Sequence, residues 1–179
     1  MHKHLARVRE FHDRFGVVQA PHTESTHLTD MDIVMRQALL LECGSDTFKA
    51  IAMGDIAKIL AGLADLAYNA LAAIACRGDN VLNVSVAWRQ DGSELTVTSL
   101  LSEKIHQCCS GDTIHYSALY ALCEQLARSF INADFDRAMQ LLHEHIMTQA
   151  ATGSTQNYEK QLHQEILPTT PDLSAALYE

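Results

Sequence analysis

The stretch DIAKILAGLADLAYNALAAIACRG, residues 55–78, decides the fold class of this chain. Its apolar side chains recur every three or four residues, which is the period of one face of an α-helix: Ile56, Ile59, Leu60, Leu63, Leu66, Ala67 and Ala70. Gly54 breaks the chain before the stretch and Gly78 lies just past its end, as is common where helices begin and stop. We therefore expect a helix from Asp55 to about Arg77.

The same stretch is apolar, but two polar side chains, Asp65 and Asn69, interrupt it. A membrane-spanning helix needs about 20 predominantly apolar residues, so we expect this helix to be buried in a protein core, with no membrane as a partner. The chain starts with MHKH and lacks the apolar segment and cleavage site of a signal peptide. A cytoplasmic location is therefore expected.

Helical periodicity continues on both sides of this stretch. It predicts further helices at residues 3–15, 30–52, 96–109, 115–132 and 134–150. Only 3 prolines and 8 glycines occur among the 179 residues, which favours long helices. We expect an all-α antiparallel bundle of about six helices in one domain, residues 1–150, followed by a loop and a loosely packed tail at residues 151–179.

Residues 79–115 allow two interpretations. Apolar residues alternate over residues 84–88, and Asp91-Gly92 is a hairpin turn signal, so a short hairpin near residues 82–97 is one of them. The period of the following residues favours a helix at 96–109, which we prefer. The whole segment is either an insertion or, through a faint repeat of the Gly-Asp helix start, the second pseudo-half of the bundle.

The chain is acidic, with a formal net charge of −9 from 22 acidic and 13 basic side chains. Nucleic-acid binding needs clustered Lys and Arg that contact phosphates, so we expect no nucleic-acid partner. A nucleotide or a small phosphate compound remains a suitable ligand when a metal ion neutralises its phosphates. The five cysteines are odd in number and match no zinc spacing, which predicts free thiols.

Four short motifs follow one another along the chain. They are FHDRFG at residues 11–16, RQALLLE at 36–42 followed by Asp46, GDIA at 54–57 leading to LADLAY at 63–68, and ADFDRA at 133–138 leading to LHEHIM at 142–147. In this order they resemble the MazG-like and phosphoribosyl-ATP pyrophosphohydrolase-like proteins of the all-α nucleoside-triphosphate pyrophosphohydrolase superfamily. The resemblance covers about residues 5–76 and 116–149.

The resemblance implies an enzyme that splits a nucleoside triphosphate into a monophosphate and pyrophosphate with Mg²⁺, or with Mn²⁺. The family places acids in an EExxE motif on one helix and an ExxD motif on the next. Acids three or four residues apart lie on one helical face, and two such faces bring carboxylate oxygens around Mg²⁺. The metal polarises the phosphates and activates a water. Members are commonly oligomeric, so a homodimer is expected.

The acid motifs are transferred residue by residue. EExxE falls on Glu42, Cys43 and Asp46, and ExxD falls on Gly62 and Asp65. The resemblance assigns Glu42, Asp46 and Asp65 to the metal, and Glu42 and Asp65 to catalysis as well. Cys43 and Gly62 stand where the family has further acids, so hydrolysis itself is left open. The alternative is a catalytically inactive protein on the same fold that senses a nucleotide or makes helical interactions.

Each acid also has a structural interpretation. Glu42 and Asp46 are one helical turn apart and suit a solvated helix face as well as a cavity lining. Asp65 lies within the most apolar helix, where a buried carboxylate must be paired or bind a cation. Its alternative to a cation is a hydrogen bond to a neighbouring helix or to Asn69, one turn further on.

Three residues are assigned to substrate contacts, His12, Arg36 and Asn69. His12 would otherwise pack and form hydrogen bonds within the bundle. Arg36 would otherwise form an ion pair with Glu42 or with an acid on a neighbouring helix. Trp88, the one tryptophan, suits stacking on a base, and a core or interface position is its more common role.

Overall fold

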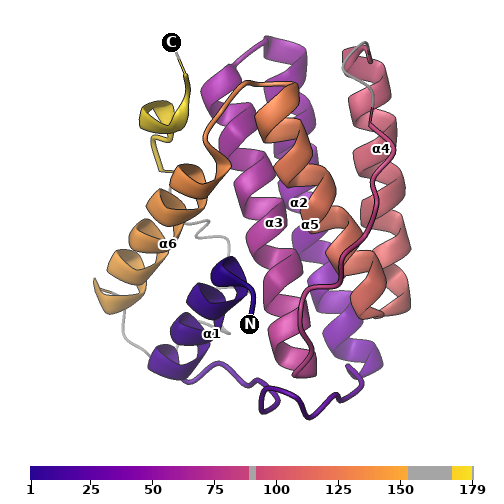
Figure 1. Cartoon of the computed structure of the whole chain (residues 1–179), viewed down its shortest axis with the longest axis vertical. Helices are drawn as coiled ribbons and strands as arrows, with labels where there is room; N and C mark the ends of the chain where they lie inside the picture. The colour runs from indigo at the N-terminus through magenta and orange to yellow at the C-terminus, as the bar shows by residue number, and fades with distance from the viewer. Residues whose placement is uncertain (89–91, 153–170, 179) are drawn as a thin grey trace.

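The computed structural model describes residues 1–88, 92–152 and 171–178 of the chain (Figure 1). Among these residues there are six α-helices, two short 3-10 helices and no strand. The elements are α1 (Lys3–Phe15), α2 (Asp30–Met53), α3 (Ile56–Arg77), α4 (Glu94–Gln107), η1 (Cys108–Ser110), α5 (Thr113–Ser129), α6 (Phe135–Thr152) and η3 (Ser174–Ala176). The expected all-α bundle is confirmed, and each predicted helix lies within a few residues of its expected ends.

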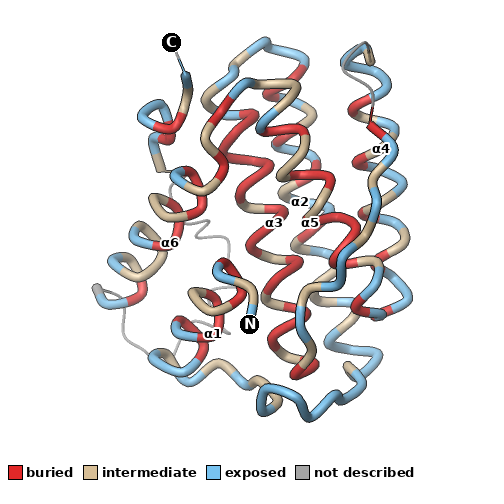
Figure 2. Tube along the Cα trace, viewed as in Figure 1, coloured by how far each residue is buried: buried red, intermediate tan, exposed pale blue. Residues whose placement is uncertain are grey.

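Helix α3 runs through the middle of the bundle, where α1, α2, α5 and α6 pack against it (Figures 1 and 2). Asp55 caps its N-terminus, because the Asp55 carboxylate accepts a hydrogen bond from the Lys58 backbone N–H at 3.1 Å. Among the described helices only α3 is long and apolar enough to span a membrane, and 83% of its most apolar window is buried inside the protein. Its apolar side chains therefore form the centre of the core.

Helix α2 packs antiparallel against α3, because only Gly54 and Asp55 separate the two helices. A capping box starts α2: the Thr29 hydroxyl accepts from the Asp32 N–H and the Asp32 carboxylate accepts from the Thr29 N–H, both at 3.1 Å. Gly54 ends α2 in the left-handed conformation, at φ 67°, which a residue without Cβ adopts without strain. This hairpin places the second sequence motif beside the third.

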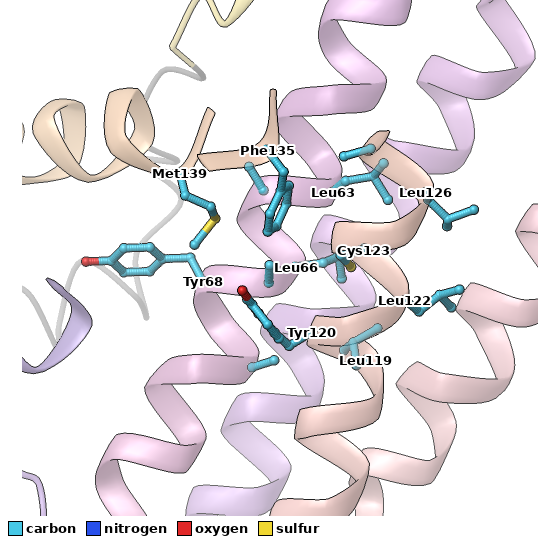
Figure 3. Close-up of a cluster of buried hydrophobic side chains, with 14 of the residues drawn as sticks. Leu63, Leu66, Tyr68, Leu119, Tyr120, Leu122, Cys123, Leu126, Phe135 and Met139 are labelled. Carbon is cyan, nitrogen blue, oxygen red and sulfur yellow. The ribbon is translucent and has the colours of Figure 1, made fainter. Parts of the chain in front are cut away.

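A cluster of apolar side chains fills the space between α3, α5 and α6 (Figure 3). Its labelled members are at most 7% exposed: Leu63, Leu66 and Tyr68 from α3, Leu119, Tyr120, Leu122, Cys123 and Leu126 from α5, and Phe135 and Met139 from α6. Fully burying one large apolar side chain contributes about 1.5–3 kcal/mol. The cluster belongs to a core that receives residues from all six α-helices.

The structure corrects the hairpin interpretation of residues 82–97. Residues 79–88 form no strand, residues 89–91 lie outside the described part, and α4 begins at Glu94. The Ser93 hydroxyl accepts from the Thr96 N–H at 3.3 Å and caps α4. The helix that we preferred for this region is therefore the one that forms.

The alternating pattern before α4 has a different cause. Val84, Val86 and Trp88 are more buried than the residues between them, as in a half-buried strand. The Leu82 N–H donates to the Ser117 hydroxyl at 3.0 Å, so the segment lies along α5. An extended segment that lies on a helix buries every second side chain without a partner strand. Trp88 is 8% exposed, which confirms its core position.

The end of the tail packs more tightly than expected. Leu173 and Ala176 are buried, and the Asp134 N–H donates to the Ala176 carbonyl oxygen at 2.8 Å, just before α6. Residues 153–170, which contain most of the predicted loop, lie outside the described part. Residues 171–178 thus belong to the folded bundle, because apolar side chains there reach the core cluster.

Candidate functional site

Asp65 is the most unusual acid of the described residues. Asp65 is half-buried on α3, and its carboxylate forms no hydrogen bond or ion pair with any described residue. Loss of solvation, together with the negative charge of Asp46, raises the pKa of Asp65 from 3.8 to about 7. Sequence analysis predicted that such a carboxylate would be paired or would bind a cation, and the structure provides no pairing partner within the described part.

The Cys43 thiol on α2 lies near enough to all three predicted acids for their charges to act on it. Burial raises the pKa of the Cys43 thiol well above its usual range, and the charges of Asp65, Glu42 and Asp46 raise it further. The Asn69 amide donates to the Cys43 sulfur at 3.6 Å and to the Asp65 backbone oxygen at 2.9 Å. The α2–α3 hairpin therefore places Asp65 and Asn69 of α3 beside Cys43 of α2, with Asp46 near enough for its charge to act on both Cys43 and Asp65, whereas Glu42 lies next to Cys43 in the chain and is exposed.

The two acids of α2 differ from Asp65 in exposure. Glu42 and Asp46 are exposed, and Asp46 forms a surface ion pair with the Lys49 amine at 2.9 Å. Surface ion pairs of this kind contribute little to stability, so Asp46 can exchange Lys49 for another cation. We call Glu42, Asp46 and Asp65, with Cys43 and Asn69, the α2–α3 acid face.

Gly62 is where the resemblance implies a further glutamate. A Cβ atom there would lie 3.2 Å from the Thr47 Cα atom and closer still to the Thr47 side chain. Thr47 is fully buried, and its hydroxyl donates to the Cys43 carbonyl oxygen at 2.7 Å. The backbones of α2 and α3 therefore approach closely at this point, and a side chain of α2 occupies the space next to Gly62.

The donor set of the acid face suits Mg²⁺ in part. Three carboxylates supply the oxygen ligands that Mg²⁺ prefers, whereas the neutral thiol of Cys43 does not. Within residues 1–88, 92–152 and 171–178, no group of three or more His, Cys, Asp or Glu side chains is gathered tightly enough to hold a metal ion. A metal shared by Glu42, Asp46 and Asp65 would need side-chain rearrangement, and the Mg²⁺ site stays a prediction.

His12 lies away from solvent on α1, at 3% exposure. Burial, together with the charges of Arg36 and Arg9, lowers the pKa of His12 to about 4, so the imidazole is neutral at pH 7. His12 Nδ1 has no hydrogen-bond partner among the described residues. Two of the predicted substrate residues, His12 and Arg36, thus lie near enough for the charge of Arg36 to act on His12.

Arg36 does not form the ion pair with Glu42 that was its structural alternative. Its guanidinium instead donates to the Cys76 sulfur at 2.8 Å, near the C-terminal end of α3. Asp65 and Cys76 are eleven residues apart on α3, which is roughly 16 Å along a helix. The third predicted contact, Asn69, lies with the acids, so one ligand would reach both groups only by lying along the α2–α3 surface.

Sequence reasoning missed two residues that shape this region. Arg9 is buried and donates to the Ala75 and Ala20 carbonyl oxygens, at 3.1 Å and 2.7 Å, closing the end of α3. Thr47 fills the space beside Gly62. Only Gly62 gave a signal, because a glycine within a helix interior often marks a close approach of two backbones.

Comparisons with known proteins add no family to this description. No family model, no curated protein and no solved structure matches the chain. The all-α bundle is thus established by the structure, and the resemblance to the pyrophosphohydrolases is carried by the sequence motifs alone.

Proposed function

We propose that this protein is of the nucleotide pyrophosphohydrolase type and binds a nucleoside triphosphate with Mg²⁺ on the α2–α3 acid face. The reaction would release a nucleoside monophosphate and pyrophosphate. The observation that carries the proposal is the half-buried carboxylate of Asp65, which has no partner among the described residues and lies near enough to Asp46 to feel its charge. Mn²⁺ is expected to replace Mg²⁺, since both take oxygen ligands.

The physical reason lies in the cost of an unpaired charge. Burying a carboxylate without a partner is unfavourable, and a bound cation removes that cost. When bound, Mg²⁺ polarises phosphate oxygens and activates a water. Asp65 would hold the metal from the buried side, while the exposed side chains of Glu42 and Asp46 can turn towards it. The guanidinium of Arg36 would contact the nucleotide further along α3, whereas His12, at 3% exposure, would reach it only after the side chains around it rearrange.

A second function, nucleotide binding without turnover, is favoured by a separate observation. The position of one family acid is Gly62, where Thr47 fills the adjacent space, and that of another is the neutral thiol of Cys43. Fewer carboxylates supply fewer oxygen ligands to the Mg²⁺ ion that would activate the attacking water. Such a protein would have the fold of the enzyme and would bind a nucleotide without hydrolysing it. The cytoplasmic location stays a prediction.

The experiment combines thermal shift with pyrophosphate release for common and modified nucleoside triphosphates, with and without Mg²⁺ or Mn²⁺. Asp65→Asn removes the charge at constant shape. Asp112→Asn is the matched control, because Asp112 is exposed at the start of α5 and its side chain forms no capping hydrogen bond. Metal-dependent release that disappears only in Asp65→Asn supports hydrolysis. Stabilisation without release supports the sensor, and the absence of both refutes nucleotide binding.

A further inference from the structure

Helix α3 is open to solvent along one narrow strip. Between residues 59 and 78, four residues are only half-buried and every other residue is buried; the four are Asp65, Asn69, Ala72 and Cys76. Their spacing of four, three and four residues places them on one face of the helix. The Asn69 amide contacts Cys43 of α2, and the Arg36 guanidinium of α2 contacts Cys76, so this face borders α2. We call these four residues the α3 strip.

The side-chain amide of Asn69 is held in one orientation. Its Nδ2 atom donates to the Asp65 carbonyl oxygen at 2.9 Å and to the Cys43 sulfur at 3.6 Å. These two contacts use both hydrogens of the amide. Turning the amide over would place Oδ1 against the Asp65 carbonyl oxygen, where two acceptors repel each other. The fold therefore favours a single arrangement of this side chain.

The oxygen of the same amide is left available. Asn69 Oδ1 accepts a hydrogen bond from no described residue, and it is not among the buried polar atoms that lack a partner, so it is open to solvent. Because its two hydrogens are engaged within the protein, Asn69 offers a ligand only this oxygen. A ligand at this point must therefore supply either a hydrogen-bond donor or a cation.

A cation suits this position better than a hydrogen-bond donor. Asp65 lies one turn before Asn69 on the α3 strip, and side chains four residues apart are neighbours on a helix. The Asp65 carboxylate has no partner among the described residues, so its charge attracts a cation to this part of the strip. Carboxylate and carbonyl oxygens are ligands that suit Mg²⁺ and Mn²⁺. The side chains of Cys43 and Gly62 supply no such oxygen, so the Asn69 amide adds a ligand that the acid face otherwise lacks.

We propose that Asn69 Oδ1 is a neutral ligand of the divalent cation that binds beside Asp65. The inference rests on the proposed function, because it concerns the metal of the α2–α3 acid face, and it makes Asn69 a metal ligand rather than a substrate contact. A neutral oxygen has a physical advantage at this point. It adds a ligand without placing a second negative charge one turn from Asp65, where the repulsion between two carboxylates would destabilise the protein without metal.

Titration with Mn²⁺ alone, followed by the loss of the EPR signal of free Mn²⁺, tests the ligand. Asn69→Leu removes the oxygen and should weaken Mn²⁺ binding by at least about tenfold, since the loss of an outer-shell partner already has an effect of that size. Asn69→Asp keeps an oxygen and removes the amide hydrogens, so it should bind Mn²⁺ at least as tightly as the wild type. Asn83→Leu is the matched control and should leave the affinity unchanged, because Asn83 is exposed and lies outside the α3 strip. Circular dichroism confirms folding of each variant.

The affinities of the variants separate this inference from the proposed function. Weaker binding by Asn69→Leu but not by Asn69→Asp supports the amide oxygen as a ligand. Equal weakening by both would show that Asn69 acts through its hydrogen bonds to Asp65 and Cys43, and would overturn the inference. An unchanged affinity of Asn69→Leu, beside weaker binding by Asp65→Asn, would also overturn it and leave the proposed function standing. Absence of Mn²⁺ binding by the wild type would overturn the inference as well, while thermal shift with nucleotides then decides separately on the proposed function.

Discussion

The close approach of α2 and α3 at Gly62 leads to a sharp prediction for Gly62→Ala. In an ordinary helix interior, alanine stabilises by about 1 kcal/mol relative to glycine. Here the added Cβ would lie 3.2 Å from Thr47 Cα and closer to the Thr47 side chain. Thr47 is β-branched, buried and hydrogen-bonded to the Cys43 carbonyl oxygen, so it has little freedom to move.

The magnitude follows from the two opposing effects. Overpacking a well-filled core lowers the free energy of unfolding by about 1–3 kcal/mol, whereas the higher helix propensity of alanine raises it by about 1 kcal/mol. Gly62→Ala should therefore lower the free energy of unfolding by about 1 kcal/mol. For a chain of this size that corresponds to roughly 2–4 °C in Tm. In Thr47→Ala, the same change at Gly62 should cost less, which a double-mutant cycle measures.

Urea unfolding followed by circular dichroism is the assay, and Gly44→Ala is the matched control. A Cβ at Gly44 would lie 2.8 Å from the terminal Cδ1 atom of Ile105, which can rotate away. Gly44→Ala should therefore be neutral or stabilising by up to about 1 kcal/mol. Equal stabilisation by Gly62→Ala would show that α2 and α3 are not in close contact there and would refute the reasoning.

Three further predictions concern ionisable and buried polar groups. The pKa of Asp65 is raised from 3.8 to about 7, so the unfolded chain loses its proton first and stability is lost as pH rises from about 4 to about 7. Relative to wild type, Asp65→Asn should gain up to about 4 kcal/mol in unfolding free energy between pH 4 and pH 8, and a pH-independent difference in urea unfolding would contradict this. The pKa of His12 is lowered to about 4, so the unfolded chain binds the proton more tightly, and stability is lost as pH falls from 6.5 towards 4. His12→Gln should remove up to about 3 kcal/mol of that loss. An unchanged pH profile of the unfolding free energy would show that His12 is solvated. The Tyr120 hydroxyl lies 2.9 Å from Nδ1 of buried His4, so Tyr120→Phe should lower the free energy of unfolding by about 1–3 kcal/mol. Tyr116→Phe, at another buried tyrosine, should lower it less, and equal shifts in Tm for the two variants would count against the hydrogen bond.

The helices could be predicted from the sequence because their signals are local. The apolar period of α3 and glycines at helix ends, such as Gly54, are visible without any partner, and both are found in the structure. Residues 84–88 show the limit of this approach. Their alternation indicates burial of every second side chain but not what covers it, and the cover is a helix rather than a strand.

The candidate site could be predicted only as a set of residues. Spacing placed Glu42 and Asp46 on one helical turn, and in the structure the charge of Asp46 acts on Asp65 across the α2–α3 hairpin. Which side chains stay in solvent depends on how the helices are rotated, and spacing alone does not fix that rotation. The same holds for Arg36, whose contact is Cys76 rather than an acid. Contacts between helices distant in the chain leave little trace in a single sequence.

The central claim is that Asp65 holds a metal–nucleotide complex on the α2–α3 acid face. Isothermal titration with α,β-imido analogues of the common nucleoside triphosphates, in Mg²⁺, measures this binding without turnover. We predict saturable binding by wild type and by Asp112→Asn, and at least about tenfold weaker binding by Asp65→Asn, a loss of about 1.4 kcal/mol. Equal affinity of all three proteins, or no binding by any of them, would contradict the claim.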